Sequence, residues 1–190
     1  ASEYSRTVDG KPIDYAKVKN NRYDNSALSS IQFKEDKPSY LNELLNAKTE
    51  EDAKMIYENQ IKKYSSSFYY VLDAYDYFSN KWKNKEFANK IIEENDNILS
   101  GNPIALKSLA YIYQAEGKFK EANKLYEDVY TLRADYAQSY LDLANSYREL
   151  GLNQKAAAMY LRYDYLLAEE LLEKEEPVKV IMDRDLNNLI

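Results

Sequence analysis

Apolar residues recur every three or four positions along most of the chain after residue 38, which is the spacing of helices that each bury one face. The pattern predicts helices over 39–46, 50–63, 67–82 and 154–175, with further helical runs on both sides of Gly117 and Gly151. Thr49-x-x-Asp52 is a helix-start signal, and Ser100-Gly101-Asn102-Pro103 ends one helix and begins the next. The sequence therefore predicts an all-α molecule.

The same pattern repeats with a fixed period. Gly117 and Gly151 are 151 − 117 = 34 residues apart, and each stands between two helical runs. Two segments recur at this offset: Leu106-x-x-Leu109-Ala110-x-x-Tyr113 returns as Tyr140-x-x-Leu143-Ala144-x-x-Tyr147, and Ala122-x-x-x-Tyr126 returns as Ala156-x-x-x-Tyr160. Glycine suits a turn with positive φ, whereas alanine lets two helices approach closely beside a tyrosine that fills the remaining space. We expect two helical hairpins here.

Residues 102–169 resemble the tetratricopeptide repeat family, whose motif combines these leucines, small residues and aromatics with a loop glycine. Two features depart from the motif: Ala134 and Ala168 replace its closing proline, and Asn153 replaces the aromatic that Phe119 supplies. The resemblance implies a right-handed α-α superhelix of roughly three to four hairpins.

Earlier units are predicted with a weaker pattern. Ala88 precedes Ala122 by 122 − 88 = 34 residues, with Ile92 at the aromatic position. In the first helix of that unit, Asp76 falls at the small position. A better apolar stripe is formed by Val71, Ala74, Tyr75, Phe78 and Trp82. A degenerate hairpin is expected before it, so the predicted repeat domain covers 38–176, with units 38–66, 67–101, 102–135 and 136–176.

The two ends lack this pattern. Residues 1–37 are predicted to be an irregular arm or linker, and the alternative is that they lie over the helical repeats with their tyrosines in the grooves. Val8–Lys11 is compatible with a small hairpin turn, although Pro12 weakens a paired strand. Pro177 is expected to end the last helix, and the β-favouring run 178–182 predicts a short extended tail over 177–190.

Composition narrows the possible functions. The chain has no cysteine and no histidine, which excludes most nucleophile–base pairs and thiolate or imidazole metal sites. Its net charge of −6 opposes nucleic-acid binding, and its apolar runs are too short for a transmembrane segment. We therefore expect no catalytic residues, no metal and no cofactor, while the oligomeric state stays open. Localisation also stays open, because a chain without cysteine fits both the cytoplasm and the cell envelope.

In the family that the chain resembles, the first helices of successive hairpins line a concave groove that binds a peptide. The resemblance implies these groove residues: Lys107, Tyr111, Gln114, Leu141, Asn145, Arg148 and Glu149. Tyr70 and Tyr77 are added as aromatic contacts, since tyrosine gives a large contact area at low entropic cost. The alternative for the tyrosines is packing between hairpins. The family's carboxylate clamp is incomplete, because Tyr111 replaces an asparagine that it needs.

Three functions are compatible with the sequence. The favoured hypothesis is a non-catalytic module that binds a protein or peptide in the groove. An alternative is a structural spacer in a larger exported or envelope bacterial protein, because residues 180–190 are similar to the junction that follows the repeats in such proteins. The third is a glycan-binding helical protein, which needs a tyrosine-lined cleft with two converging carboxylates.

Overall fold

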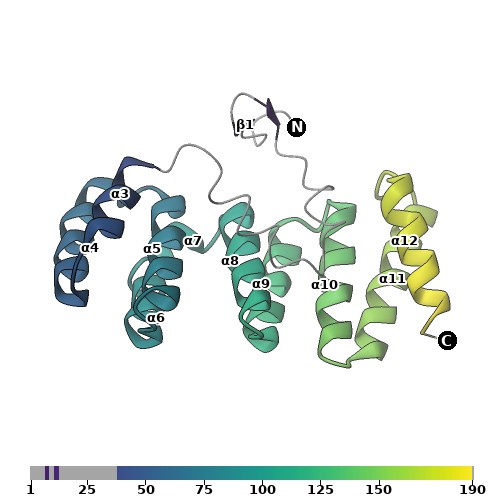
Figure 1. The fold of residues 1–190 in the computed structure, drawn as a ribbon. Coiled ribbons are helices and arrows are strands. Elements are labelled where there is room, and N and C mark those ends of the chain that lie inside the picture. The colour runs from purple at the N-terminus through teal and green to yellow at the C-terminus, as the bar shows by residue number, and fades with distance from the viewer. Residues whose placement is uncertain (1–6, 9–10, 13–37, 190) are drawn as a thin grey trace. The chain divides into compact units, whose positions relative to one another are not determined.

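The computed structural model describes residues 7–8, 11–12 and 38–189 (Figure 1). It divides the chain into two compact units, Ala1–Lys48 and Thr49–Ile190. The described residues are helical apart from one pair of two-residue strands, which confirms the all-α class. Among these residues, no helix combines the length and the apolar character needed to cross a bilayer.

The first unit contains β1 (Thr7–Val8), β2 (Lys11–Pro12) and α3 (Ser39–Asn46). The strands are antiparallel, with Thr7 opposite Pro12 and Val8 opposite Lys11, so the small hairpin is formed. The rest of the predicted arm, residues 1–6, 9–10 and 13–37, lies outside the described residues. Helix α3 has the predicted bounds.

The second unit consists of nine helices in the part of the chain that the structure describes. They are α4 (Glu50–Tyr64), α5 (Phe68–Asn80), α6 (Lys85–Glu94), α7 (Asp96–Leu99), α8 (Pro103–Ala115), α9 (Phe119–Leu132), α10 (Ala137–Glu149), α11 (Asn153–Ala168) and α12 (Glu176–Asn187). Polar side chains cap several starts: Thr49, Ser67, Asn84 and Asn102 each accept a hydrogen bond from a backbone N–H in the first turn. The starts of these four helices are therefore encoded locally.

Glycine ends the first helix of both predicted hairpins. Gly117 and Gly151 have φ of +75° and +72°. Their N–H groups donate to the carbonyls of Gln114 and Arg148 at 3.0 and 2.9 Å. The next N–H in each turn reaches back to the carbonyl of Tyr113 or Tyr147, both at 2.8 Å. This is the Schellman arrangement, in which a left-handed residue satisfies the last carbonyls of a helix.

The helices pack in consecutive pairs. Contacts join α5 with α6, α8 with α9, and α10 with α11, and Figure 1 shows the last two pairs side by side. Further contacts join α8 to α5 and α10 to α9. Ala88, Ala122 and Ala156, one in each pair, are completely buried. The three alanines therefore have the same degree of burial, as their 34-residue spacing predicts.

Helix α5 buries four of the five residues of the predicted apolar stripe, while the fifth, Trp82, lies beyond the end of the helix at Asn80 and is only partly buried. Val71, Ala74, Tyr75 and Phe78 are completely buried, whereas Asp76 is only partly so. In the following helix α6, Ile91 is buried rather than Ile92, the residue expected at the aromatic position. Ile91 follows the buried Ala88 by three residues, which also places it on the buried face of this short helix.

A polar network fastens α5 to the turn between α8 and α9. The hydroxyl groups of Tyr75 and Ser79 donate to the two carboxylate oxygens of Glu116 at 2.7 and 3.1 Å. Lys118 Nζ lies 2.8 Å from Glu116 and donates to the Tyr75 hydroxyl at 2.7 Å. Burial alone would raise the pKa of Glu116, but the hydrogen bonds from Lys118 and Tyr75 outweigh it and lower the pKa.

The C-terminal prediction was wrong in two respects. The last predicted helix ends at Ala168 rather than near residue 175, and the expected extended tail over 177–190 is instead helix α12 through Asn187. Pro177 lies in the first turn of α12, where its missing N–H has no cost, and so begins a helix rather than ending one. Val178, Met182 and Asp185 are buried at helical spacing, and that burial overrides the β preference of this run.

Candidate partner-binding site

The candidate residues of α8 and α10 form what we call the first-helix row: Lys107, Tyr111 and Gln114 on α8, with Leu141, Asn145, Arg148 and Glu149 on α10. On α8 the spacing of four and three residues places the side chains on one face. All three are partly buried. The start of α8 is fixed because Asn102 Oδ1 accepts from the N–H groups of Ile104 and Ala105 at 3.1 and 3.2 Å.

Lys107 is bound to the neighbouring first helix. Its Nζ lies 2.6 Å from Asp142 Oδ2, and Asp142 also accepts a hydrogen bond from Gln138 at 2.8 Å. The Asp142 side chain is almost completely buried, so the pair is shielded from water. Burial lowers the pKa of Lys107, but the charge of Asp142 outweighs this, and the pKa is raised overall. Lys107 therefore stays charged and joins α8 to α10.

Tyr111 and Gln114 lie beside the second helix of their own hairpin. The Tyr111 ring meets the Tyr126 ring edge-on at 6.3 Å, and Lys107 Nζ lies 5.9 Å from the Tyr111 ring centroid. The Tyr126 hydroxyl donates to Gln114 Oε1 at 2.7 Å. Gln114 Nε2 donates in turn to Glu149 Oε2 at 2.5 Å, which makes a second link between α8 and α10.

The α10 side of the row is more deeply buried. Leu141 is in the core, and Asn145 has only 6% of its surface exposed. Asn145 Nδ2 is closed to solvent and has no hydrogen-bond partner in the described structure. Arg148 Nη1 lies 2.9 Å from Asp185 Oδ2, and Asp185 is buried on α12. Asn145 is thus the residue of the row whose amide donor is left unsatisfied.

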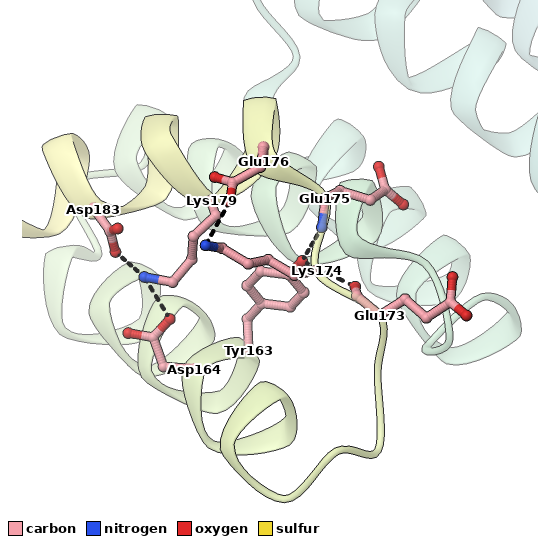
Figure 2. A network of polar contacts seen from close by, with 8 residues as sticks. All are labelled: Tyr163, Asp164, Glu173, Lys174, Glu175, Glu176, Lys179 and Asp183. Carbon is pink, nitrogen blue, oxygen red and sulfur yellow. Dashed lines mark hydrogen bonds and ion pairs between the residues drawn. The ribbon is translucent and has the colours of Figure 1, made fainter.

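Helix α12 is held against the last hairpin by a polar network (Figure 2). Lys179 bridges Asp164 of α11, at 3.1 Å, and Asp183 of its own helix. The completely buried Tyr163 accepts from the backbone N–H of Glu175 at 3.3 Å and donates to the Glu173 carbonyl at 3.5 Å. Together with Arg148, these contacts attach α12 to both helices of the preceding hairpin.

Tyr70 and Tyr77 do not belong to an exposed surface, contrary to the expectation for aromatic contacts. Tyr70 is completely buried, lies 6.1 Å from the parallel ring of Tyr57 and donates to Gln60 Oε1 at 3.2 Å. Tyr77 is also buried and meets Phe78 edge-on at 5.1 Å. Both side chains pack within the helices around α5, the alternative considered for them.

Sequence reasoning missed the two aspartates that pair with the row. Asp142 follows Lys107 by 142 − 107 = 35 residues, and Glu149 follows Gln114 by the same offset. Polar residues that are 35 positions apart, one more than the repeat period, thus pair with each other across neighbouring first helices. A search of the sequence for polar pairs at this spacing would have found Asp142. Asp185 could not be found in this way, because it lies on a helix that was not predicted.

The row offers hydrogen-bond donors, one aromatic ring and paired charges. In the part of the chain that the structure describes, no three metal-ligating side chains come together. Comparison of the chain with family models, with curated proteins and with solved structures found no match.

Proposed function

We propose that the hairpins of the second unit form a right-handed superhelix of the tetratricopeptide type that binds a peptide segment of a protein partner. In this proposal the partner lies in a concave groove along the first-helix row, and no reaction is catalysed. The 34-residue period, the paired packing of α8 with α9 and α10 with α11, and the complete burial of Ala122 and Ala156 support such an array.

The unsatisfied amide of Asn145 is the observation that carries the binding proposal. A buried donor without an acceptor costs about 1–3 kcal/mol. The carbonyl of a bound peptide would supply that acceptor and recover this cost on binding. Asn145 lies in the same row as Tyr111, which provides contact area, and one helical turn from Arg148.

Binding at this position requires a side chain to move. Asn145 Nδ2 is closed to solvent in the unbound chain. We therefore expect affinity to depend on Asn145.

The proposal is tested by selecting binders from a random peptide library displayed on phage, with the whole chain as bait. Calorimetry then compares wild type with Asn145→Leu, and with Asn187→Leu as a matched change at an exposed position on α12. We expect Asn145→Leu to weaken binding at least about tenfold, equivalent to roughly 1.4 kcal/mol, with folding stability unchanged or improved. Equal affinity of the two variants would show that the peptides bind elsewhere.

A second candidate function, a structural spacer, is favoured by the pairing within the row. Lys107 with Asp142, Gln114 with Glu149, and Arg148 with Asp185 already engage most of its polar groups. The same selection separates the candidates, because a spacer yields no peptide whose binding depends on Asn145 or Tyr111.

A further inference from the structure

The last hairpin exposes apolar side chains on a helix that is otherwise packed. Leu161 and Tyr165 of α11 are 56% and 51% exposed, and Leu171 in the following turn is 65% exposed. Leu161 and Tyr165 are one helical turn apart and so form a continuous ridge. The N–H of Leu171 donates to the carbonyl of Leu166 at 2.8 Å, which folds the turn back onto the end of α11. We call Leu161, Tyr165 and Leu171 the end patch.

The corresponding positions of the earlier hairpins are polar. Counted from the buried alanine of each second helix, Leu161 is five residues beyond Ala156, and the residues five beyond Ala53, Ala88 and Ala122 are Glu58, Glu93 and Glu127. In α9, Glu127 accepts a hydrogen bond from the Tyr147 hydroxyl at 2.8 Å, so a neighbouring first helix covers that position. Leu161 has lost the charge of its counterparts and remains open to solvent.

Acidic residues lie close to the end patch in the sequence. Glu169 and Glu170 follow the last residue of α11, at the negative end of the helix dipole, and Glu173 lies two residues beyond Leu171. None of these three exposed carboxylates has an ion-pair partner among the residues that the structure describes. The cations in this stretch are Arg162, 5.4 Å from the Tyr165 ring centroid, and Lys174, which pairs with Glu176 at 2.6 Å, so the acidic residues outnumber them. The region therefore favours a cationic ligand.

We propose that the end patch is a second docking surface, separate from the first-helix row, for a basic amphipathic helix of a partner protein. Leucines of that helix would pack across the ridge of Leu161 and Tyr165, as helix ridges pack into grooves. Its lysines or arginines would pair with Glu169, Glu170 and Glu173. Anionic lipid and nucleic-acid surfaces are disfavoured, because the same carboxylates repel them.

The apolar part is tested with a synthetic helix that carries leucines on one face and lysines on the other. Its affinity is measured by fluorescence anisotropy for wild type and for the double variant Leu161→Gln/Tyr165→Thr, which mutates two exposed side chains without changing the charge. Met55→Gln is the control, since Met55 is an equally exposed apolar residue on α4. We expect the double variant to bind at least about tenfold more weakly and the control to change less than about twofold.

The charged part is tested with Glu169→Gln/Glu173→Gln, against Glu93→Gln/Asp128→Asn, which neutralises two exposed acids on α6 and α9. We expect only the first variant to lose most of the salt dependence of binding. Failure of the helix to bind wild type, or equal weakening by patch and control variants, would overturn the proposal. Sedimentation equilibrium provides a further check, because self-association that Leu161→Gln abolishes would identify a second copy of the chain as the occupant instead.

Discussion

Lys107 Nζ and Asp142 Oδ2 lie 2.6 Å apart and join the first helices of two successive hairpins. The two residues are separated by one repeat period plus one residue, so the contact depends on how α8 and α10 stack. Because Asp142 is buried, the loss of its counter-charge leaves an uncompensated carboxylate in the protein interior.

Lys107→Met is therefore expected to lower the free energy of unfolding by about 2–3 kcal/mol, less than for a fully buried pair because the lysine is partly exposed. The double variant Lys107→Met/Asp142→Leu should recover most of this loss, since an apolar pair needs no charge compensation. Urea denaturation of both variants measures the effect. A double variant no more stable than Lys107→Met would show that Asp142 is not the cause.

Gly151 and Glu170 have the same backbone conformation with opposite consequences for substitution. Both have a positive φ, 72° and 56°, and both donate to a carbonyl three residues earlier. Gly151→Ala should cost about 1–2 kcal/mol through backbone strain alone, because no atom lies within 4 Å of the added Cβ. Glu170→Gly should instead stabilise the chain by about 0.5–1 kcal/mol. Thermal unfolding of Glu170→Gln separates the effect of charge, and a gain equal to that of Glu170→Gly would exclude the strain argument.

Because Ala156 is closely packed, we expect a larger side chain at this position to reduce the stability of the fold strongly. Ala156 is completely buried between α11 and its neighbours, whereas Ala158 on the same helix is exposed. We expect Ala156→Leu to destabilise the fold by about 1–3 kcal/mol through overpacking, and Ala158→Leu to have an effect within about 0.5 kcal/mol. Chemical denaturation measures the free energy of unfolding of the two variants. Similar losses of stability would contradict the packing described for this hairpin.

A buried and an exposed apolar residue on α12 together test whether this helix packs against the preceding hairpin. Met182 is 1% exposed and Val180 is 63% exposed. Met182→Ala should cost about 2–4 kcal/mol, and Val180→Ala less than about 0.5 kcal/mol. If hydrogen exchange shows α12 unprotected in wild type, or if both substitutions are neutral, the docked position of α12 is wrong.

Alkaline pH is expected to unfold the chain. Burial raises the pKa of Tyr113, Tyr140 and Tyr147 from 10.0 to about 12. Because the unfolded chain releases these protons first, the stability is full below pH 10 and is lost as the pH rises towards 12. Urea unfolding midpoints across this range, together with tyrosinate absorbance, measure the loss. Tyr147→Phe should make the decline shallower, and a constant midpoint would refute the prediction.

The accuracy of the sequence-based predictions depended on how local each signal was. Thr49, Asn102, Gly117 and Gly151 each determine a helix end through their own backbone and nearest neighbours, and the structure places all four where their chemistry predicts. Pro177 is ambiguous locally, because proline both follows helices and begins them. Only the tertiary burial of its helix decides between the two.

The candidate site was less predictable than the fold. The resemblance identified positions on α8 and α10, but it could not show that Gln114 contacts α10 and that Arg148 contacts α12. Tyr70 lies on a helix where the small residue of the repeat pattern is missing, so the sequence does not indicate which face of the helix is buried. Its burial depends on packing with Tyr57 and Tyr64. Contacts between residues far apart in the chain determined these outcomes.

The position of Glu116 affects how the helices on either side of it unfold. This carboxylate belongs to the turn of one hairpin, yet its two oxygens are held by hydroxyl groups from the hairpin before it. Opening either hairpin alone would break both of these hydrogen bonds, because Tyr75 and Ser79 belong to one hairpin and Glu116 to the other. We therefore expect α5 to α9 to lose structure as one cooperative block, with amide protons on both sides exchanging at a common rate.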